Sequence, residues 1–280
     1  MTTPHHSASW LFVPGDRPDR FDKAACSGAH EVVIDLEDSV GPERKRAARE
    51  HATTWLTGGC TGWVRVNPIG SLWHEADLAA LASCPGLRGV MVPKSQGPAT
   101  LTRVAEGLPR HVGIVPLVET ALGVHNAATI AACPAVTVLA FGSIDYALDI
   151  DADETDQALL YARGALVVAS RAAGLPAPID GVTVRATDTA AVRAAATRAR
   201  SLGFGGKLCI HPAQVDVVNA AFRPSRTDIE WAHTVLAGLA AQPDRGVFHI
   251  NGEMVDEPVL ARARRILDRA DRLPEGNHRR

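Results

Sequence analysis

Charged and polar side chains that could carry chemistry follow short apolar runs at many points along this 280-residue chain. They are Arg17, Asp35, Glu37, Asp38, Arg65, Lys94, Glu119, Asp145, Asp180 and His211. If the runs bring these residues together, their carboxylates repel one another unless cations balance them, and a divalent metal ion is the simplest balance. Carboxylate ligands without nearby thiolates favour Mg²⁺ or Mn²⁺ over zinc. The residue types therefore predict a Mg²⁺ site, with Mn²⁺ as the alternative.

Glu119 and Asp145 form the best candidate pair of metal ligands, because they close two consecutive apolar runs. Mg²⁺ takes only one or two carboxylates in most protein sites and keeps several waters, which leaves positions for a chelating substrate. Either residue alone could equally be an ordinary loop acid. Their matching positions favour the metal site.

Arg65 follows an apolar strand and would be costly to bury without an anion. Its planar guanidinium suits a carboxylate or a developing enolate oxygen, and an ion pair with Glu37 or Asp38 is the structural alternative. Glu37 and Asp38 could order metal-bound waters from a second layer, or could serve equally well in salt bridges. Arg17 and Lys23 lie in the first loop and helix, where cations could hold phosphates or simply aid solubility.

Motifs of several other enzyme classes are missing from the sequence. No glycine-rich phosphate loop follows a predicted strand, which argues against a nucleotide-binding fold. The segment 142–144 reads Gly-Ser-Ile and lacks the glycine that follows the serine of a nucleophile elbow, which argues against a serine hydrolase. His211 could act as a base, although a structural role before Pro212 is the favoured interpretation.

Eight short runs rich in β-branched residues alternate with stretches of helical spacing, which predicts βαβ units on a parallel sheet. The predicted strands are 9–14, 31–38, 62–68, 89–94, 113–120, 137–145, 178–183 and 206–212. Eight repeats favour closure into a (β/α)8 TIM barrel, a fold of about 250 residues. Active sites of this fold lie at the carboxyl ends of the strands, so the polar residues that end the runs should converge on one mouth of the barrel.

The predicted helix before the eighth strand has one apolar stripe, formed by Val192, Ala195, Ala196, Ala199 and Leu202. Gly203 should end this helix, since the residue after a helix often needs a positive φ. Beyond the eighth unit, further helical stretches begin near Thr227 and Glu257. We assign residues 1–222 to the barrel and 223–280 to a C-terminal helical extension of the same domain, serving as a lid or a subunit contact.

Composition narrows the class of protein further. The chain is 46% hydrophobic and 21% charged, as expected for a globular protein, and its net charge of -2 gives no reason to expect nucleic acid. No apolar run approaches the roughly 20 residues of a membrane-spanning helix. The five cysteines are scattered without a C-x-x-C pair, so neither a zinc site nor a disulfide framework is expected. These features predict a cytoplasmic protein.

Four motifs in order along the chain resemble the citrate lyase β-subunit-like (CitE-like) proteins. They are SWLFVPGDRP at 9–18, VIDLEDSV at 33–40, VRVN at 64–67 and GGKLCIHP at 205–212. That group belongs with malyl-CoA and citramalyl-CoA lyases to the HpcH/HpaI aldolase superfamily. The resemblance runs from about residue 9 to about residue 270.

The resemblance implies a Mg²⁺-dependent barrel enzyme, usually a trimer or hexamer, that cleaves or forms a carbon–carbon bond in 3-hydroxyacyl-CoA thioesters such as malyl-CoA or citramalyl-CoA. By motif position, Glu119 and Asp145 are similar to the family's metal ligands, and Arg65 to its catalytic, substrate-binding arginine. The positions similar to those that contact the CoA thioester are Phe12, Arg17 and Lys23.

The C-terminal segment 251–258, NGEMVDEP, resembles a family element whose aspartate reaches the active site of a neighbouring subunit, and Asp256 occupies that place. This would give the C-terminal extension a catalytic purpose. Ile144 departs from the family pattern, since many members have an acidic residue directly before the aspartate that corresponds to Asp145. Two alternatives stay open. The chain could be the β subunit of a multi-subunit citrate lyase that acts on an acyl-carrier-protein thioester, or a catalytically silent binding subunit.

Overall fold

The structure is a computed structural model that describes residues 7–241, 247–250 and 252–272. Its chain divides into two compact units, Met1–Asn219 and Ala220–Arg280. Each unit has its own apolar core.

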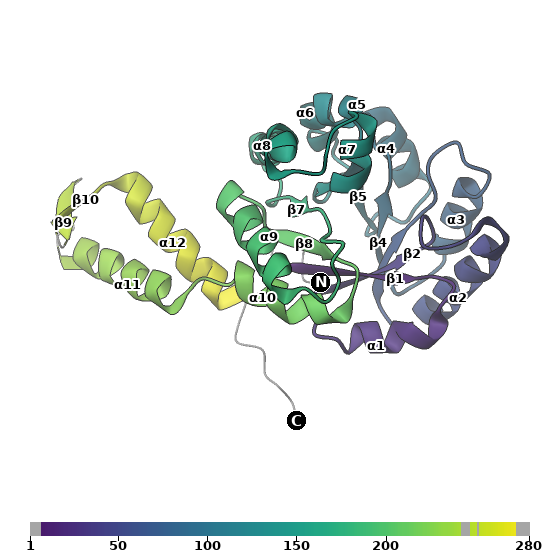
Figure 1. Ribbon diagram of the computed structural model, residues 1–280, viewed down its shortest axis with the longest axis horizontal. Coiled ribbons are helices and arrows are strands. Elements are labelled where there is room, and N and C mark those ends of the chain that lie inside the picture. The colour runs from purple at the N-terminus through teal and green to yellow at the C-terminus, as the bar shows by residue number, and fades with distance from the viewer. Residues whose placement is uncertain (1–6, 242–246, 251, 273–280) are drawn as a thin grey trace. The chain divides into compact units, whose positions relative to one another are not determined.

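Eight parallel strands form a closed barrel in the first unit, and each pairs with the next in chain order (Figure 1). They are β1 (Ser9–Pro14), β2 (Glu31–Asp35), β3 (Gly62–Arg65), β4 (Leu87–Val92), β5 (Gly113–Val118), β6 (Ala140–Phe141), β7 (Ile179–Asp180) and β8 (Gly206–Cys209). Strand β1 pairs with both β2 and β8, which closes the sheet. The predicted (β/α)8 TIM barrel is confirmed.

Helices surround the barrel and connect its strands (Figure 1). The short 3-10 helices are η1 (Pro18–Arg20), η2 (Pro42–Arg44) and η3 (Pro212–Gln214). The α-helices are α1 (Phe21–Ala25), α2 (Lys45–Thr57), α3 (His74–Leu81), α4 (Pro98–Glu106), α5 (Ala121–His125), α6 (Ala127–Ala131), α7 (Ser143–Asp149), α8 (Asp156–Ala172), α9 (Thr189–Leu202) and α10 (Val215–Phe222). Helix α9 buries its predicted stripe at Val192, Ala195, Ala196 and Ala199 and ends at Gly203, which has the predicted positive φ, 104°.

The barrel interior is filled by side chains from alternate positions along the strands, because successive strand residues point to opposite faces. Its buried members are Trp10, Val33, Trp63, Met91, Val115, Leu117, Val138, Ala140, Ile179 and Leu208. The indole rings of Trp10 and Trp63 pack with their centroids 5.0 Å apart. A Cβ on Gly113 would lie 2.9 Å from Trp63, so the missing side chain there makes room for the indole.

Strand alternation also decides which polar residues face the carboxyl end of the barrel interior. Phe12 lies two residues beyond Trp10, and Asp35 two residues beyond Val33. Arg65 likewise lies two residues beyond Trp63. These three side chains therefore point to the same side of the sheet as the core residues, one layer nearer the mouth.

The second unit contains α11 (Arg226–Ala241), β9 (Phe248–Ile250), β10 (Glu253–Val255) and α12 (Glu257–Arg272). The two strands pair antiparallel, and Gly252 between them has a φ of 84°. Their presence corrects the prediction of a purely helical extension, because the short alternating run before Asp256 pairs as a hairpin between the two helices. The core of this unit comprises Ala232, Val235, Val255, Leu260 and Ala263. The assignment of both units to one domain stays a prediction.

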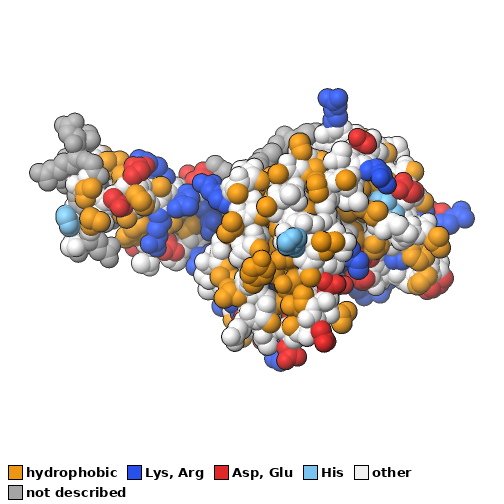
Figure 2. All heavy atoms as spheres, turned by 90° about the horizontal axis from the view of Figure 1, so that it is seen from above, with side chains coloured by type: hydrophobic (Ala, Val, Ile, Leu, Met, Phe, Trp, Pro, Cys, Tyr) orange, Lys and Arg blue, Asp and Glu red, His pale blue; other side chains and the backbone are white. Residues whose placement is uncertain are grey.

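An apolar face covers part of the outer surface of the barrel (Figure 2). Leu160, Tyr161 and Val168 of α8 are largely exposed there. Together with residues of α5 and α6 and small residues of α8, they line a groove of about 530 Å³. All five cysteines are free thiols. Within the described part of the chain, no helix has the length and apolarity that a membrane span requires.

Candidate functional site

Arg65 is held rigidly at the end of β3. Its Nε and Nη2 atoms donate to the two carboxylate oxygens of Asp35, each at 2.7 Å. Asp35 also accepts the backbone N–H groups of Glu37 at 2.9 Å and Ser39 at 3.1 Å. The guanidinium carbon lies 4.7 Å from the ring centroid of Phe12. Paired parallel hydrogen bonds and a cation–π contact together fix the orientation of the guanidinium.

Glu37 and Asp38 complete the surroundings of Arg65. Nη1 of Arg65 lies 3.0 Å from Glu37 Oε2 and 3.4 Å from Asp38 Oδ2. Glu37 Oε2 is buried and, despite this ion pair, lacks a well-aligned hydrogen bond. Burial raises the pKa of the Glu37 carboxyl even though the Arg65 guanidinium favours its charged form. Lys45 supports this segment from behind, since its Nζ donates to the carbonyls of Leu36 and Glu37, each at 2.7 Å.

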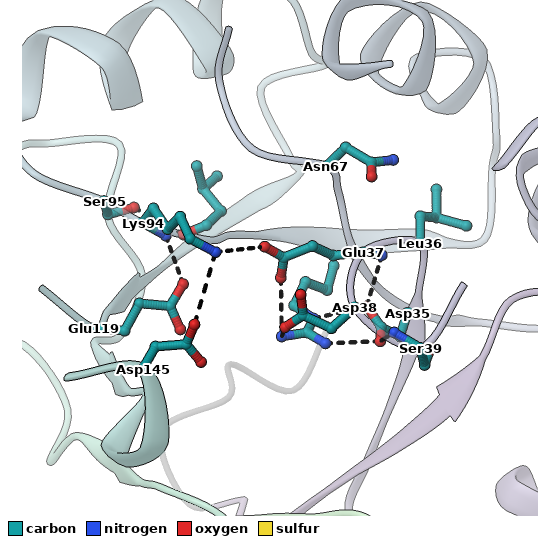
Figure 3. A network of polar contacts seen from close by, with 12 residues as sticks. Asp35, Leu36, Glu37, Asp38, Ser39, Asn67, Lys94, Ser95, Glu119 and Asp145 are labelled. Carbon is teal, nitrogen blue, oxygen red and sulfur yellow. Dashed lines mark hydrogen bonds and ion pairs between the residues drawn. The ribbon is translucent and has the colours of Figure 1, made fainter. Parts of the chain in front are cut away.

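Lys94 links this group to the acids of the next strands. Its Nζ lies 3.2 Å from Glu37 Oε1 and 3.8 Å from Asp145 Oδ1. Its backbone N–H donates to Glu119 Oε1 at 2.8 Å. Figure 3 shows the Lys94 side chain reaching between Glu37 on one side and Glu119 and Asp145 on the other. One residue therefore contacts three carboxylates.

Glu119 directly follows β5 and is 2% exposed. Burial, reinforced by the negative charges of Glu37 and Asp145, raises its pKa to about 8. Gly142 makes room for this side chain, because a Cβ at position 142 would lie 2.6 Å from Glu119 Cβ. The carboxylate thus sits in a tight and electrostatically unfavourable place, which a nearby cation would relieve.

Asp145 lies in the first turn of α7 and not at the end of a strand as predicted. The sixth strand is only two residues long because the chain leaves the sheet at Gly142 and begins a helix at Ser143. The Asp145 carboxylate still reaches the same group, as its contact with Lys94 indicates, and its side chain is 37% exposed. The predicted partner of Glu119 therefore comes from a helix and lies nearer the solvent.

The donor set of these carboxylates fits Mg²⁺. Glu119 and Asp145 offer only oxygen atoms, and their mutual repulsion is part of what raises the Glu119 pKa. Among the described residues no three His, Cys, Asp or Glu side chains are gathered as a complete metal-binding set. Two carboxylates with open positions match a cation that keeps several waters, whereas a structural zinc site needs four protein ligands.

Two residues predicted at the mouth have structural partners. Asp180 is fully buried and pairs with Arg163 Nε at 2.9 Å and Lys207 Nζ at 3.7 Å. Ile179 fills the barrel interior, so the next residue must face the surrounding helices. His211 is exposed, and its Nδ1 accepts the backbone N–H of Ala213 at 3.1 Å at the start of η3. That contact matches the structural interpretation of His211.

The remaining predicted residues have other partners or surroundings. Arg17 pairs with Asp19 at 3.1 Å in the loop after β1, and Lys23 is exposed on α1. Asp256 belongs to the second unit, where its Oδ1 accepts the Val259 N–H at 3.2 Å as the N-cap of α12. Asn251, the first residue of the C-terminal motif, lies outside the described residues.

Sequence reasoning missed Asp35, Lys94 and Gly142 as site residues. Asp35 and Lys94 are among the polar residues that end the apolar runs, but their residue types and spacing did not distinguish them from the other members of that set. The spacing of Asp35 from Val33 was a usable signal, because it matches the spacing of Arg65 from Trp63. Gly142 carried no such signal, since the need for glycine there arises only when Glu119 is packed against it.

Comparison with known proteins gives consistent matches over most of the chain. The family model described as HpcH/HpaI aldolase/citrate lyase matches residues 8–212. A citrate lyase subunit beta-like protein of Deinococcus radiodurans is 40% identical over 274 residues, covering 92% of this chain and 95% of that protein. A (3S)-malyl-CoA thioesterase of Cereibacter sphaeroides is 34% identical, covering 96% of each. The crystal structure of CitE from Mycobacterium tuberculosis in complex with magnesium, acetoacetate and coenzyme A is 33% identical, with a TM-score of 0.84, covering 95% of this chain and 98% of that one.

Proposed function

Because the chain belongs to the HpcH/HpaI aldolase/citrate lyase family, we propose that it is a Mg²⁺-dependent carbon–carbon lyase that cleaves or forms a 3-hydroxyacyl-CoA thioester such as malyl-CoA or citramalyl-CoA. Membership confirms the resemblance of the sequence motifs. The observation that carries the proposal is the grouping of Glu119 and Asp145 with Lys94, beside the rigid Arg65. The CitE structure that contains magnesium and coenzyme A supports the choice of cation and thioester.

Glu119 and Asp145 would hold the cation. When bound, Mg²⁺ supplies Lewis acidity and a template for the carboxylate and hydroxyl oxygens of the acid half of the substrate. Glu119 is kept in place by the Lys94 N–H and by the space at Gly142. Asp145 is more exposed and leaves the mouth side of the pair open to a ligand.

Arg65 would stabilise negative charge on the thioester oxygen as the carbon–carbon bond breaks. Its guanidinium is already oriented by Asp35 and Phe12, so little reorganisation is needed during the reaction. Three carboxylates surround it, and this ensures that it stays charged. Its side chain keeps 11% of its surface exposed.

Asp256, donated by a neighbouring protomer, would accept the proton of the substrate's 3-hydroxyl group. The electrons of that O–H bond form the new carbonyl of the released acid, and the C2–C3 bond supplies the electron pair of the thioester enolate. Protonation of the enolate carbon then gives acetyl-CoA from a malyl or citramalyl thioester. In condensation the same steps run in reverse, and Asp256 returns the proton.

Phe12, Arg17 and Lys23 are proposed to contact the CoA thioester. Arg17 lies in the loop that follows β1, at the carboxyl side of the barrel, whereas Lys23 lies on α1 beside Asp22, which accepts a hydrogen bond from Trp55 of α2. A phosphate would have to replace Asp19 as the partner of Arg17. Self-association, as a trimer or hexamer, is supported by the exposed apolar face that carries Leu160 and Val168 of α8.

Hydrolysis of the thioester is a second candidate, because a relative of similar length is a (3S)-malyl-CoA thioesterase. The two activities share the substrate but differ in products. A lyase releases acetyl-CoA and a 2-oxo acid, whereas a thioesterase releases free CoA and the hydroxy acid. A citrate lyase β subunit would instead need an acyl-carrier-protein thioester.

The test is to incubate the purified protein with malyl-CoA, citramalyl-CoA and citryl-CoA, with Mg²⁺, Mn²⁺ or EDTA, and to measure acetyl-CoA and free thiol separately. Metal-dependent acetyl-CoA release supports the lyase, and free thiol alone supports the thioesterase. Absence of both products overturns a free-standing enzyme on CoA and favours a carrier-protein substrate or a silent subunit. Two variants serve as loss-of-function controls: Glu119→Gln removes a proposed metal ligand, and Asp256→Asn removes the proposed proton acceptor. Asn at position 256 still caps α12, so the second variant should keep its fold.

A further inference from the structure

We propose that Lys94 is a positioning residue that sets how tightly the carboxylate site binds its cation. Its backbone N–H orients Glu119, and its ammonium group gives Glu37 and Asp145 a fixed positive charge (Figure 3). This inference rests on the proposed function, because it takes Glu119 and Asp145 as the residues that hold Mg²⁺.

The backbone of Lys94 is in a conformation that calls for an explanation. Its φ of 51° lies in the left-handed region, which residues other than glycine, asparagine and aspartate seldom adopt. Such conformations persist where the surrounding structure requires them, and they concentrate at functional sites. Here the conformation aims the Lys94 N–H at Glu119 Oε1, 2.8 Å away, while the same residue's side chain turns to Glu37.

The charge balance around Lys94 gives its side chain a distinct role. Arg65, the other cation of this group, is engaged by Asp35, Glu37 and Asp38. Lys94 is the cation whose contact with Asp145 is observed among the described residues. Its ammonium therefore shares Asp145 with any cation that the carboxylates hold. Like charges repel, so the ammonium should weaken Mg²⁺ binding while it keeps the carboxylates together.

The variants must preserve the left-handed backbone. Lys94→Asn removes the ammonium but tolerates a positive φ. Lys94→Arg keeps the charge. Arg46→Gln removes one positive charge from an exposed position on α2, where Arg46 pairs with Glu50, and serves as the matched control.

The first measurement is Mg²⁺ affinity by calorimetry, together with the change in melting temperature between EDTA and Mg²⁺. We expect Lys94→Asn to bind Mg²⁺ on the order of tenfold more tightly and to gain more melting temperature from Mg²⁺ than the wild type. The substitution can also relieve strain in the backbone at position 94. That effect is the same in EDTA and in Mg²⁺, so it cancels from the change in melting temperature between the two buffers. Lys94→Arg and Arg46→Gln should stay within twofold of the wild type. Unchanged or weaker Mg²⁺ binding by Lys94→Asn would overturn the proposal.

The second measurement needs no metal and separates this proposal from the proposed function. In EDTA at a pH above about 8, where Glu119 is charged, added NaCl screens repulsion among Glu37, Glu119 and Asp145, so the melting temperature of Lys94→Asn should rise more than that of the wild type. An equal salt response would contradict the role of Lys94 as their counter-ion. Failure of the wild type to bind Mg²⁺ would overturn the metal assignment, and the salt response would still decide on Lys94.

Discussion

Two clusters of the same charged residue types occupy different places in the barrel. The mouth cluster consists of Asp35, Glu37, Arg65, Lys94, Glu119 and Asp145 at the carboxyl ends of β2 to β6. The wall cluster consists of Arg163, Asp180 and Lys207, between β7, β8 and α8. The first opens toward solvent at Lys94 and Asp145, and the second is buried throughout.

The two clusters differ more in their ratio of carboxylates to cations than in the types of residue they contain. Carboxylates outnumber cations in the mouth cluster, and the pKa of Glu119 is raised to about 8. In the wall cluster two cations share Asp180, with exposed Asp156 also 3.7 Å from Arg163, and burial lowers the pKa of Lys207. An excess of carboxylates near solvent can be balanced by a divalent cation. Where buried cations are in excess, removal of a carboxylate leaves a buried charge unpaired and destabilises the fold.

The same substitution should therefore cost much more stability in the wall cluster than in the mouth cluster. Asp180→Ala leaves Lys207 buried without its counter-ion and Arg163 with only the exposed Asp156, and should cost about 3–5 kcal/mol of unfolding free energy. Asp145→Ala in EDTA should cost less than about 1 kcal/mol, because a partly exposed acid is removed from among like charges. Urea unfolding of both variants measures this. Similar losses in the two would mean that the mouth cluster is also a structural ion network.

Arginine geometry should matter for catalysis only at the mouth. Arg65→Lys cannot form the two parallel hydrogen bonds to Asp35, so kcat/KM should fall by about 100-fold. Arg163→Lys should lower stability while kcat/KM of the folded protein stays near that of the wild type. Steady-state kinetics with the best thioester substrate, alongside unfolding curves, checks both. A fall in kcat/KM for Arg163→Lys equal to that for Arg65→Lys would remove the distinction.

The raised pKa of Glu119 predicts how stability depends on pH in EDTA. Glu119 binds its proton more tightly in the folded protein, with a pKa of about 8, than in the unfolded chain, where the value is near 4.5. Its contribution is fully present below the unfolded pKa and is lost as pH rises through about 8. Between pH 7 and alkaline pH the wild type should lose about 1.4 kcal/mol more than Glu119→Gln. Parallel pH profiles of the two proteins in urea unfolding would refute the assignment.

A steric change beside the mouth cluster should have the smallest effect. Gly142→Ala brings a methyl group to within 2.6 Å of Glu119 Cβ and should displace that side chain. Mg²⁺ affinity should fall about tenfold, as for other residues that orient metal ligands. Gly107→Ala is the control, because a Cβ there would be 3.6 Å from its nearest neighbour. Calorimetric Mg²⁺ titration of both variants is the measurement, and equal affinities would show that Glu119 does not depend on this space.

Periodicity in the sequence predicted the barrel well, since all eight runs became strands and Gly203 ends its helix. It could not decide which face of a strand each polar residue occupies. Parallel strands covered on both sides are apolar on both faces, so the sequence around Asp35 and around Asp180 looks alike. Only packing shows that Val33 and Ile179 fill the interior, and hence that Asp35 faces the mouth and Asp180 the helices.

Element boundaries were the other weakness. The run 137–145 reads as one strand from its β-branched residues, yet the chain turns into α7 at Ser143, and Asp145 moves from a strand to a helix. In the second unit, helical spacing on both sides hid a hairpin of two three-residue strands. The roles assigned to Phe12, Arg17, Lys23 and Asp256 came from the family resemblance, and they stay predictions.

The shortness of β6 and β7 bears on how the barrel opens. These strands are joined by a single register pair, Ala140 with Ile179, whereas β1 and β2 share five. Backbone amides around that seam should exchange with solvent hydrogen well before those of β1 and β2. Glu119 follows β5, whereas Asp145 lies just beyond β6. A cation held by both residues would link the segments that follow β5 and β6, beside this seam. Binding of the cation to the closed form should then lower the population of the locally open form.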